Sequence, residues 1–162
     1  MEKIIEKPNP TQIHKNEDIS YLRQIYNNYQ ISDKMSDEAL LVDYIFQVGG
    51  EGKNSIKELD DLINLSTVDN KSIRRVVIAA IGRINSLPKK SIPVLMHALF
   101  DTDKLVQQYA AAGIGLFSPE DLIKYKAMDY LIKASTSDDS SVREFVNETL
   151  SRVEKAFPNN SV

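Results

Sequence analysis

Apolar residues recur every three to four positions along most of this chain, with polar residues between them. Leu22, Ile25 and Tyr29 begin the pattern, and Asp18 stands where an N-cap is expected. The later stretches fall into pairs joined by short polar turns. The first predicted helix begins after Asp18, and the others span 36–48, 54–66, 71–86, 91–100, 103–117, 119–135 and 139–156. The pattern therefore predicts an all-α chain of about four helix pairs.

Aspartate-rich turns precede the second helix of the last three pairs. A carboxylate there accepts hydrogen bonds from the free backbone N–H groups and suits the positive helix end. Prolines stand near the starts of the first helices, where a missing N–H costs least. The turn residues are Asp69, Asp101, Asp103, Asp138 and Asp139, and the prolines are Pro88, Pro93 and Pro119.

The second helices also align with one another. A shift of 33 residues carries Ile73 onto Val106 and Gly82 onto Gly115, and a further shift of 36 reaches Val142. The same shift backwards places Gly49 under Gly82. A period of this length is typical of stacked helix pairs, which bury their apolar faces only together. We expect an α-α superhelix, or solenoid.

The segments DNKSIRRVVIAAIGRI, DTDKLVQQYAAAGIGLF and DDSSVREFVNETLSRV carry a recognisable motif. They resemble second helices of HEAT repeats, in particular the short HEAT-like repeats first named in phycobilisome lyases. The resemblance covers residues 55–155 well, and residues 18–50 only through the weaker offset match. The family includes scaffolds, pigment lyases, metal hydroxylases and DNA glycosylases, so the motif specifies a fold and not an activity.

The resemblance also implies structural roles for charged residues in the turns. Aspartate and arginine side chains would link neighbouring repeats in a ladder. Gln107 stands where the motif has arginine, which predicts one weaker rung. The ladder residues are Asp69, Arg74, Asp103, Asp139 and Arg143.

A helical wheel gives each second helix a face opposite its core stripe. In HEAT-type stacks the second helices line the concave side, so these faces predict a groove that binds a partner. The groove residues are Val42, Ile45, Arg75, Ile78, Gln108, Ala111, Glu144 and Asn147. They grade from apolar at the N-terminal end to acidic at the C-terminal end. Burial of Val42, Ile45 and Phe46 under the first helix or the N-terminal tail is an equal alternative.

This groove assignment leads to a specific expectation. Replacing Arg75 and Ile78 together should abolish partner binding without unfolding the chain.

Composition narrows the class of protein. The net charge of −3 and the sequence pI near 5.4 argue against a general nucleic-acid binder, which needs a basic excess. The chain has no cysteine, which removes disulfides and thiolate chemistry and suits a cytoplasmic protein. Neither a signal peptide nor a membrane span is visible. We expect an extended tail over 1–17, one repeat domain over 18–157 and a short tail over 158–162.

Candidate chemistry is sparse. The two histidines, His14 and His97, lie far apart in the sequence, and neither belongs to the His-Glu pairs that a metal hydroxylase of this fold requires. The pairs Asp60-Asp61 and Asp138-Asp139 fit solvated helix caps better than a general acid and base. We therefore predict no catalytic residue, no metal and no cofactor.

The leading hypothesis is a non-enzymatic module that binds another protein, as an adaptor, inhibitor or immunity-type protein. Its negative charge would steer it to a basic target. By resemblance alone, the alternatives are a phycobilin-lyase-like enzyme or chaperone and a HEAT-type DNA glycosylase. The short stack counts against the lyase, and the acidic charge and absence of tryptophan count against the glycosylase. The sequence is compatible with a monomer or a homodimer.

Overall fold

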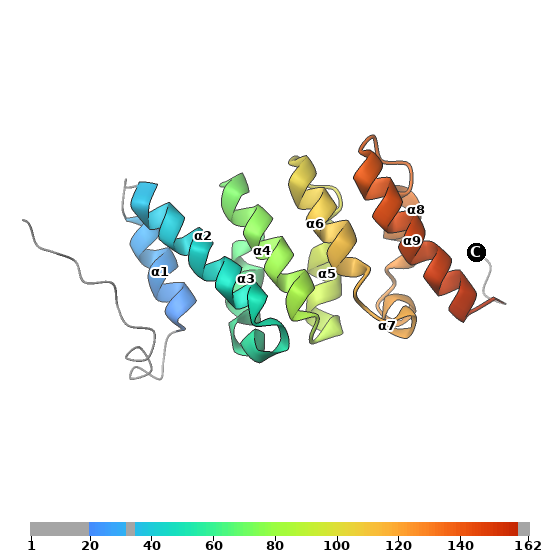
Figure 1. The fold of residues 1–162 in the computed structure, drawn as a ribbon, viewed down its shortest axis with the longest axis horizontal. Helices are drawn as coiled ribbons and strands as arrows, with labels where there is room; N and C mark the ends of the chain where they lie inside the picture. Colours follow the sequence, from blue (N-terminus) through green and yellow to red (C-terminus); the bar gives the residue numbers. More distant parts are fainter. Residues whose placement is uncertain (1–19, 32–34, 159–162) are drawn as a thin grey trace, which may run out of the picture.

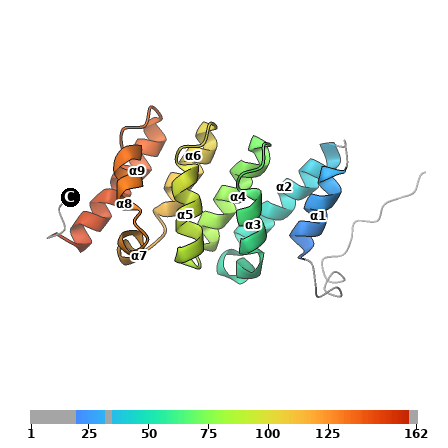
Figure 2. The same ribbon diagram turned by 180° about the vertical axis from the view of Figure 1, so that it is seen from behind.

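The computed structural model describes residues 20–31 and 35–158, and the regular structure in these ranges is entirely helical. The elements are α1 (Tyr21–Gln30), α2 (Met35–Gly50), a 3₁₀ helix η2 (Gly52–Glu58), α3 (Leu59–Leu65), α4 (Lys71–Ile84), α5 (Pro88–Ala98), α6 (Lys104–Ile114), α7 (Pro119–Lys124), α8 (Met128–Ala134) and α9 (Ser140–Ala156). They form two layers, with α2, α4, α6 and α9 on one side (Figure 1). The helices α1, α3, α5, α7 and α8 form the other layer (Figure 2). We call α2, α4, α6 and α9 the second helices.

Side-chain caps fix where the later second helices begin. Asp103 accepts hydrogen bonds from the N–H groups of Leu105 and Val106, and Asp139 does the same for α9. Before α4 the cap is Asn70, one residue beyond the expected Asp69. Each cap satisfies N–H groups that have no partner within the helix.

Two expected starts are placed differently. Asp18 lies outside the described residues, and the Oγ of Ser20 caps α1 by accepting from the N–H of Arg23. The helix expected over 91–100 begins at Pro88, so Pro93 lies inside α5 and only Pro88 stands at the start. Leu87, just before it, has a left-handed backbone with φ of 48°.

The helix expected over 119–135 is divided into α7 and α8. Lys126 adopts a left-handed conformation with φ of 58°. The N–H of Ala127 then donates to the carbonyl of Leu122, and the N–H of Lys126 donates to that of Ile123. This pair of hydrogen bonds is the Schellman pattern that ends a helix, usually with glycine in the left-handed position. Because lysine occupies that position here, no glycine marked the break in the sequence.

The core runs continuously through the stack. The equivalent residues Ile73, Val106 and Val142 are all fully buried, as the internal period predicts. Small residues let neighbouring second helices approach closely. A Cβ atom added to Gly82 would lie 2.7 Å from the Cα of Gly113 on α6. The stack is thus held together by backbone contact as well as by side-chain packing.

The first helix pair joins the stack in the same way. A Cβ atom on Gly49 of α2 would lie 3.0 Å from the Cα of Ala80 on α4, which repeats the contact between α4 and α6. Behind it, Arg23 of α1 forms an ion pair with Asp61 of α3. Residues 20–31 and 35–50 therefore pack as a further repeat.

A candidate protein-binding surface

The surface of the second helices is hollowed in two places. One hollow, of about 310 Å³, extends from α2 across α4 to Leu105 and Tyr109 of α6. The other, of about 480 Å³, extends from α4 across α6 to α9. Ala79, Arg83 and Tyr109 line both, so the hollows are neighbours. We call the two together the second-helix groove.

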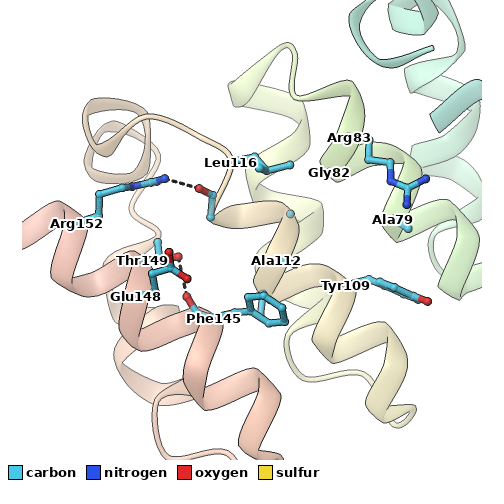
Figure 3. Close-up of a pocket in the computed structure, with 13 residues that line it drawn as sticks. Ala79, Gly82, Arg83, Tyr109, Ala112, Leu116, Phe145, Glu148, Thr149 and Arg152 are labelled. Atoms are coloured by element: carbon cyan, nitrogen blue, oxygen red, sulfur yellow. Dashed lines mark hydrogen bonds between the residues drawn. The ribbon is translucent and has the colours of Figure 1, made fainter. Parts of the chain in front are cut away.

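Exposed apolar side chains project into this groove. Tyr109 reaches from α6 towards α4, and Phe145 reaches from α9 towards α6 (Figure 3). Each keeps about two fifths of its surface exposed, and Phe46 at the other end keeps 60%. The five exposed apolar residues of the groove are Phe46, Leu105, Tyr109, Leu116 and Phe145. Large apolar side chains gathered in a hollow are typical of a surface that binds another molecule.

The charged residues of the groove are three arginines and one glutamate. Arg75 forms an ion pair with Asp103. Arg152 donates hydrogen bonds to the backbone carbonyls of Gly115 and Phe117. Only Glu148 brings a negative charge into the groove. Within the larger hollow, Arg152 therefore offsets the charge of Glu148, whereas the sequence predicts an acidic C-terminal end.

Arg83 differs from the other two arginines. Its guanidinium lies 5.4 Å from the centre of the Phe46 ring, which holds it by a cation–π interaction. Within the described residues it makes neither a hydrogen bond nor an ion pair. Its N–H donors therefore stay available at the boundary between the two hollows.

The structure corrects part of the predicted groove. Ile45, Ile78 and Ala111 have no exposed surface and belong to the core. The wheel treated each second helix as having one buried face, whereas α4 packs against α2 and α6 as well as α3 and α5. These three side chains cannot contact a partner directly, although Ile45 and Ala111 lie beneath the hollows.

The remaining predicted groove residues lie at the surface. Val42 and Arg75 line the smaller hollow and are half-buried. Gln108 is also half-buried, while Glu144 and Asn147 are exposed on α9 outside both hollows. Of Val42, Ile45 and Phe46, for which burial was an equal alternative, Ile45 is buried and Phe46 is exposed.

Arg75 and Gln108 have a structural task that the sequence did not reveal. The guanidinium of Arg75 lies 2.6 Å and 2.8 Å from the two carboxylate oxygens of Asp103, the cap of α6. Gln108 donates in the same way to Asp139, the cap of α9, at 3.0 Å. Each side chain thus links one second helix to the start of the next. The Arg75 guanidinium, with backbone N–H groups, lowers the pKa of Asp103 to about 2.

The ladder implied by the resemblance is therefore shifted by one residue. Arg74 does reach the next repeat, through an ion pair with Asp101, not Asp103. It also donates to the carbonyls of Val68 and Asp69, so Asp69 takes part through its backbone.

The equivalents of Arg74 stay within their own repeats. Gln107 donates to the carbonyl of Asp101, and Arg143 to that of Ser137, each six residues back. Gln107 therefore keeps the carbonyl contact within its repeat, but it makes no ion pair with the next repeat as Arg74 does.

Two classes of site are absent from the part of the chain that the structure describes. No three histidine, cysteine, aspartate or glutamate residues come together in a way that would hold a metal ion. His97 is exposed, with its ring 6.2 Å from that of Tyr130, and His14 is outside the described ranges. None of the described helices has both the length and the apolar character needed to cross a membrane.

The paired aspartates near the first repeat have ordinary structural partners. Asp60 is exposed and pairs with Lys90, as expected of a solvated carboxylate. Asp61 is buried instead and accepts hydrogen bonds from Ser20 and Arg23. Neither carboxylate faces the groove.

Comparison with known proteins places the fold. No family model and no curated protein matches the chain. Two crystal structures of engineered proteins match with TM-scores of 0.59 and 0.58, each at 20% identity, over 83% and 85% of this chain. The chain spans 63% and 70% of those two proteins. A designed armadillo repeat protein in complex with peptide (KR)4 matches at TM-score 0.56 and 18% identity, over 85% of this chain and 71% of its own.

At these identities the likeness concerns the fold alone. Together with the layers of paired helices, it defines the chain as an all-helical repeat solenoid.

Proposed function

We propose that this chain is a non-enzymatic binding module that holds a peptide segment of another protein in the second-helix groove. The observation that supports this best is the set of exposed apolar side chains from α2, α6 and α9 around two adjoining hollows. A folded domain leaves such a surface open to water at a cost in hydration, which binding recovers. The related fold of the designed armadillo protein, in complex with a peptide, provides a precedent for the architecture.

The shape of the groove favours a peptide over a flat protein surface. Packed helices lie about 8–10 Å apart, so the groove crosses its four helices over roughly 30 Å. An extended chain advances about 3.3 Å per residue, and some nine residues span that length. Anchoring side chains in the two hollows would fix the register of the peptide.

Selection from a displayed library of random peptides tests this function, because it does not require the natural partner. We expect sequences enriched on the wild-type protein to lose binding to Tyr109→Ala and to Phe145→Ala. Truncating a buried aromatic anchor costs about 2 kcal/mol or more, which is about thirtyfold in affinity.

The matched control is Ile132→Ala. Ile132 lies on α8, in the opposite layer, and is 41% exposed, as Tyr109 is. Its replacement should leave binding unchanged. The proposal fails if no peptide is enriched, or if the control weakens binding as much as the groove variants do.

A further inference from the structure

The charges of the second-helix groove run opposite to those of the whole chain. The net charge of the chain is −3, yet the groove contains Arg75, Arg83 and Arg152 against Glu148 alone. Asp103 neutralises Arg75, and a positive balance remains after that pairing. Glu144, the carboxylate that the sequence predicts for the groove, lies outside both hollows.

Arg83 is the cation best placed to receive a ligand. The guanidinium of Arg75 already donates to the carboxylate of Asp103, and that of Arg152 donates to backbone carbonyls. Arg83 has no such partner among the described residues, and the Phe46 ring restricts where its guanidinium can lie. A side chain that is partly oriented beforehand loses less entropy when it binds.

From this arrangement we infer that the occupant of the groove is an acidic peptide, whose Asp or Glu carboxylate is bound by Arg83 between two apolar side chains. The inference rests on the proposed function. Guanidinium and carboxylate groups match in a bidentate geometry that is stronger than a neutral hydrogen bond. The sequence had favoured a basic target from the overall charge, and the local charge of the groove favours the opposite.

The positions of the hollows set the spacing within such a peptide. The smaller hollow centres on α4 and the larger on α6, so the two are separated by about one helix spacing, roughly 10 Å. An extended peptide covers this distance in about three residues. Because Arg83 lines both hollows, the acidic residue of the peptide falls between two apolar residues about three positions apart.

The same library selection tests this chemistry when the enriched sequences are read for charge. Acidic sequences with two apolar residues at that spacing should dominate. A selected peptide, made with a fluorescent label, should bind Arg83→Gln at least about tenfold more weakly, which is the usual worth of a charge-assisted hydrogen bond. Replacing its acidic residue by the corresponding amide should weaken binding to the wild type equally, and should have little further effect on Arg83→Gln.

Lys133→Gln is the matched control. Lys133 is also an exposed cation over an aromatic ring, 4.7 Å from the centre of Phe100, but it lies on α8 in the opposite layer. Its replacement changes the net charge by the same amount, so it separates a local contact from general electrostatic attraction. We expect less than about a twofold change, since a distant exposed charge is screened by salt.

Distinct outcomes overturn the inference and the proposed function. Enrichment of basic or uncharged peptides, or equal losses for Arg83→Gln and Lys133→Gln, would overturn the acidic ligand and leave a peptide-binding groove. Binding of a labelled single-stranded oligonucleotide that depends on Arg83, with no peptide enriched, would overturn both. Failure of any peptide to be enriched would refute the proposed function itself.

Discussion

The close approach of α4 and α6 makes a quantitative prediction for Gly82→Ala. The new Cβ atom would lie 2.7 Å from the Cα of Gly113, whereas carbon atoms in contact are ordinarily about 3.5–4.0 Å apart. The obstacle is backbone, so the two helices must separate by about 1 Å along much of their contact. Overpacking of this kind costs about 3 kcal/mol, and the better helix propensity of alanine returns about 1 kcal/mol. We expect a net loss of about 2 kcal/mol.

Gly50→Ala is the control for this prediction. Gly50 also lies in a helix, but an added Cβ atom meets nothing within 4 Å. The gain in propensity should then appear alone, as a stabilisation below the roughly 1 kcal/mol of a helix interior, because Gly50 is the last residue of α2.

Urea unfolding followed by circular dichroism measures both free energies, and thermal unfolding should show Gly82→Ala lower by about 4–8 °C. A Gly82→Ala protein at least as stable as wild type would refute the close packing of α4 on α6. Equal losses of stability in the two variants would show that the effect comes from replacing any helical glycine, and not from the contact with Gly113.

Three further predictions concern stability. Asp103→Asn keeps the cap of α6 and loses the ion pair with Arg75, so it should cost about 0.5 kcal/mol, against about 2 kcal/mol for Asp103→Ala. Because the pKa of Asp103 falls from 3.8 to about 2 on folding, its contribution is full above about pH 4 and is lost towards pH 2. As the pH falls from about 4 to 2, the urea midpoint should therefore fall less steeply for Asp103→Asn than for the wild type. Equal slopes would exclude a contribution of the Asp103 carboxylate to stability. Lys126→Gly should stabilise the chain by about 0.5–1 kcal/mol by relieving the left-handed lysine, and a lower melting temperature would contradict this. Ile78→Ala should cost about 3 kcal/mol in urea unfolding, since Ile78 is fully buried; a loss below about 1 kcal/mol would be inconsistent with its place in the core.

The burial of Ile78 changes how the expected Arg75 and Ile78 double variant would be interpreted. Its loss of binding would not identify a groove, because both residues stabilise the stack. Variants of Tyr109 and Phe145 test the groove instead, because each side chain is exposed and lines a hollow.

The helical repeat was predictable because burial itself has the period of the repeat. Ile73, Val106 and Val142 align in the sequence and are equally buried in the structure. Boundaries were predictable where a side chain starts the helix by capping its first N–H groups, as Asp103 and Asp139 do. The break between α7 and α8 at Lys126 was not predictable, because lysine has no preference for the left-handed conformation that it adopts.

The groove was harder to predict from the sequence than the core. A helical wheel does not show how many helices pack against a given helix, so it places Ile78 at the surface although the residue is fully buried. Tyr109 and Phe145 fit the apolar period and would pass as core residues. Their alignment at a shift of 36 was a signal, since two aromatic residues repeat on a helix face outside the main core stripe.

Mapping a selected peptide onto the protein by NMR tests the central claim most directly. Titration of the unlabelled peptide into ¹⁵N-labelled protein should shift the amide signals of α2, α4, α6 and α9, most strongly around Arg83, Tyr109 and Phe145. The signals of α5 and α8 should stay in place. Shifts concentrated on α5 and α8 would place the binding surface on the other layer and contradict the account.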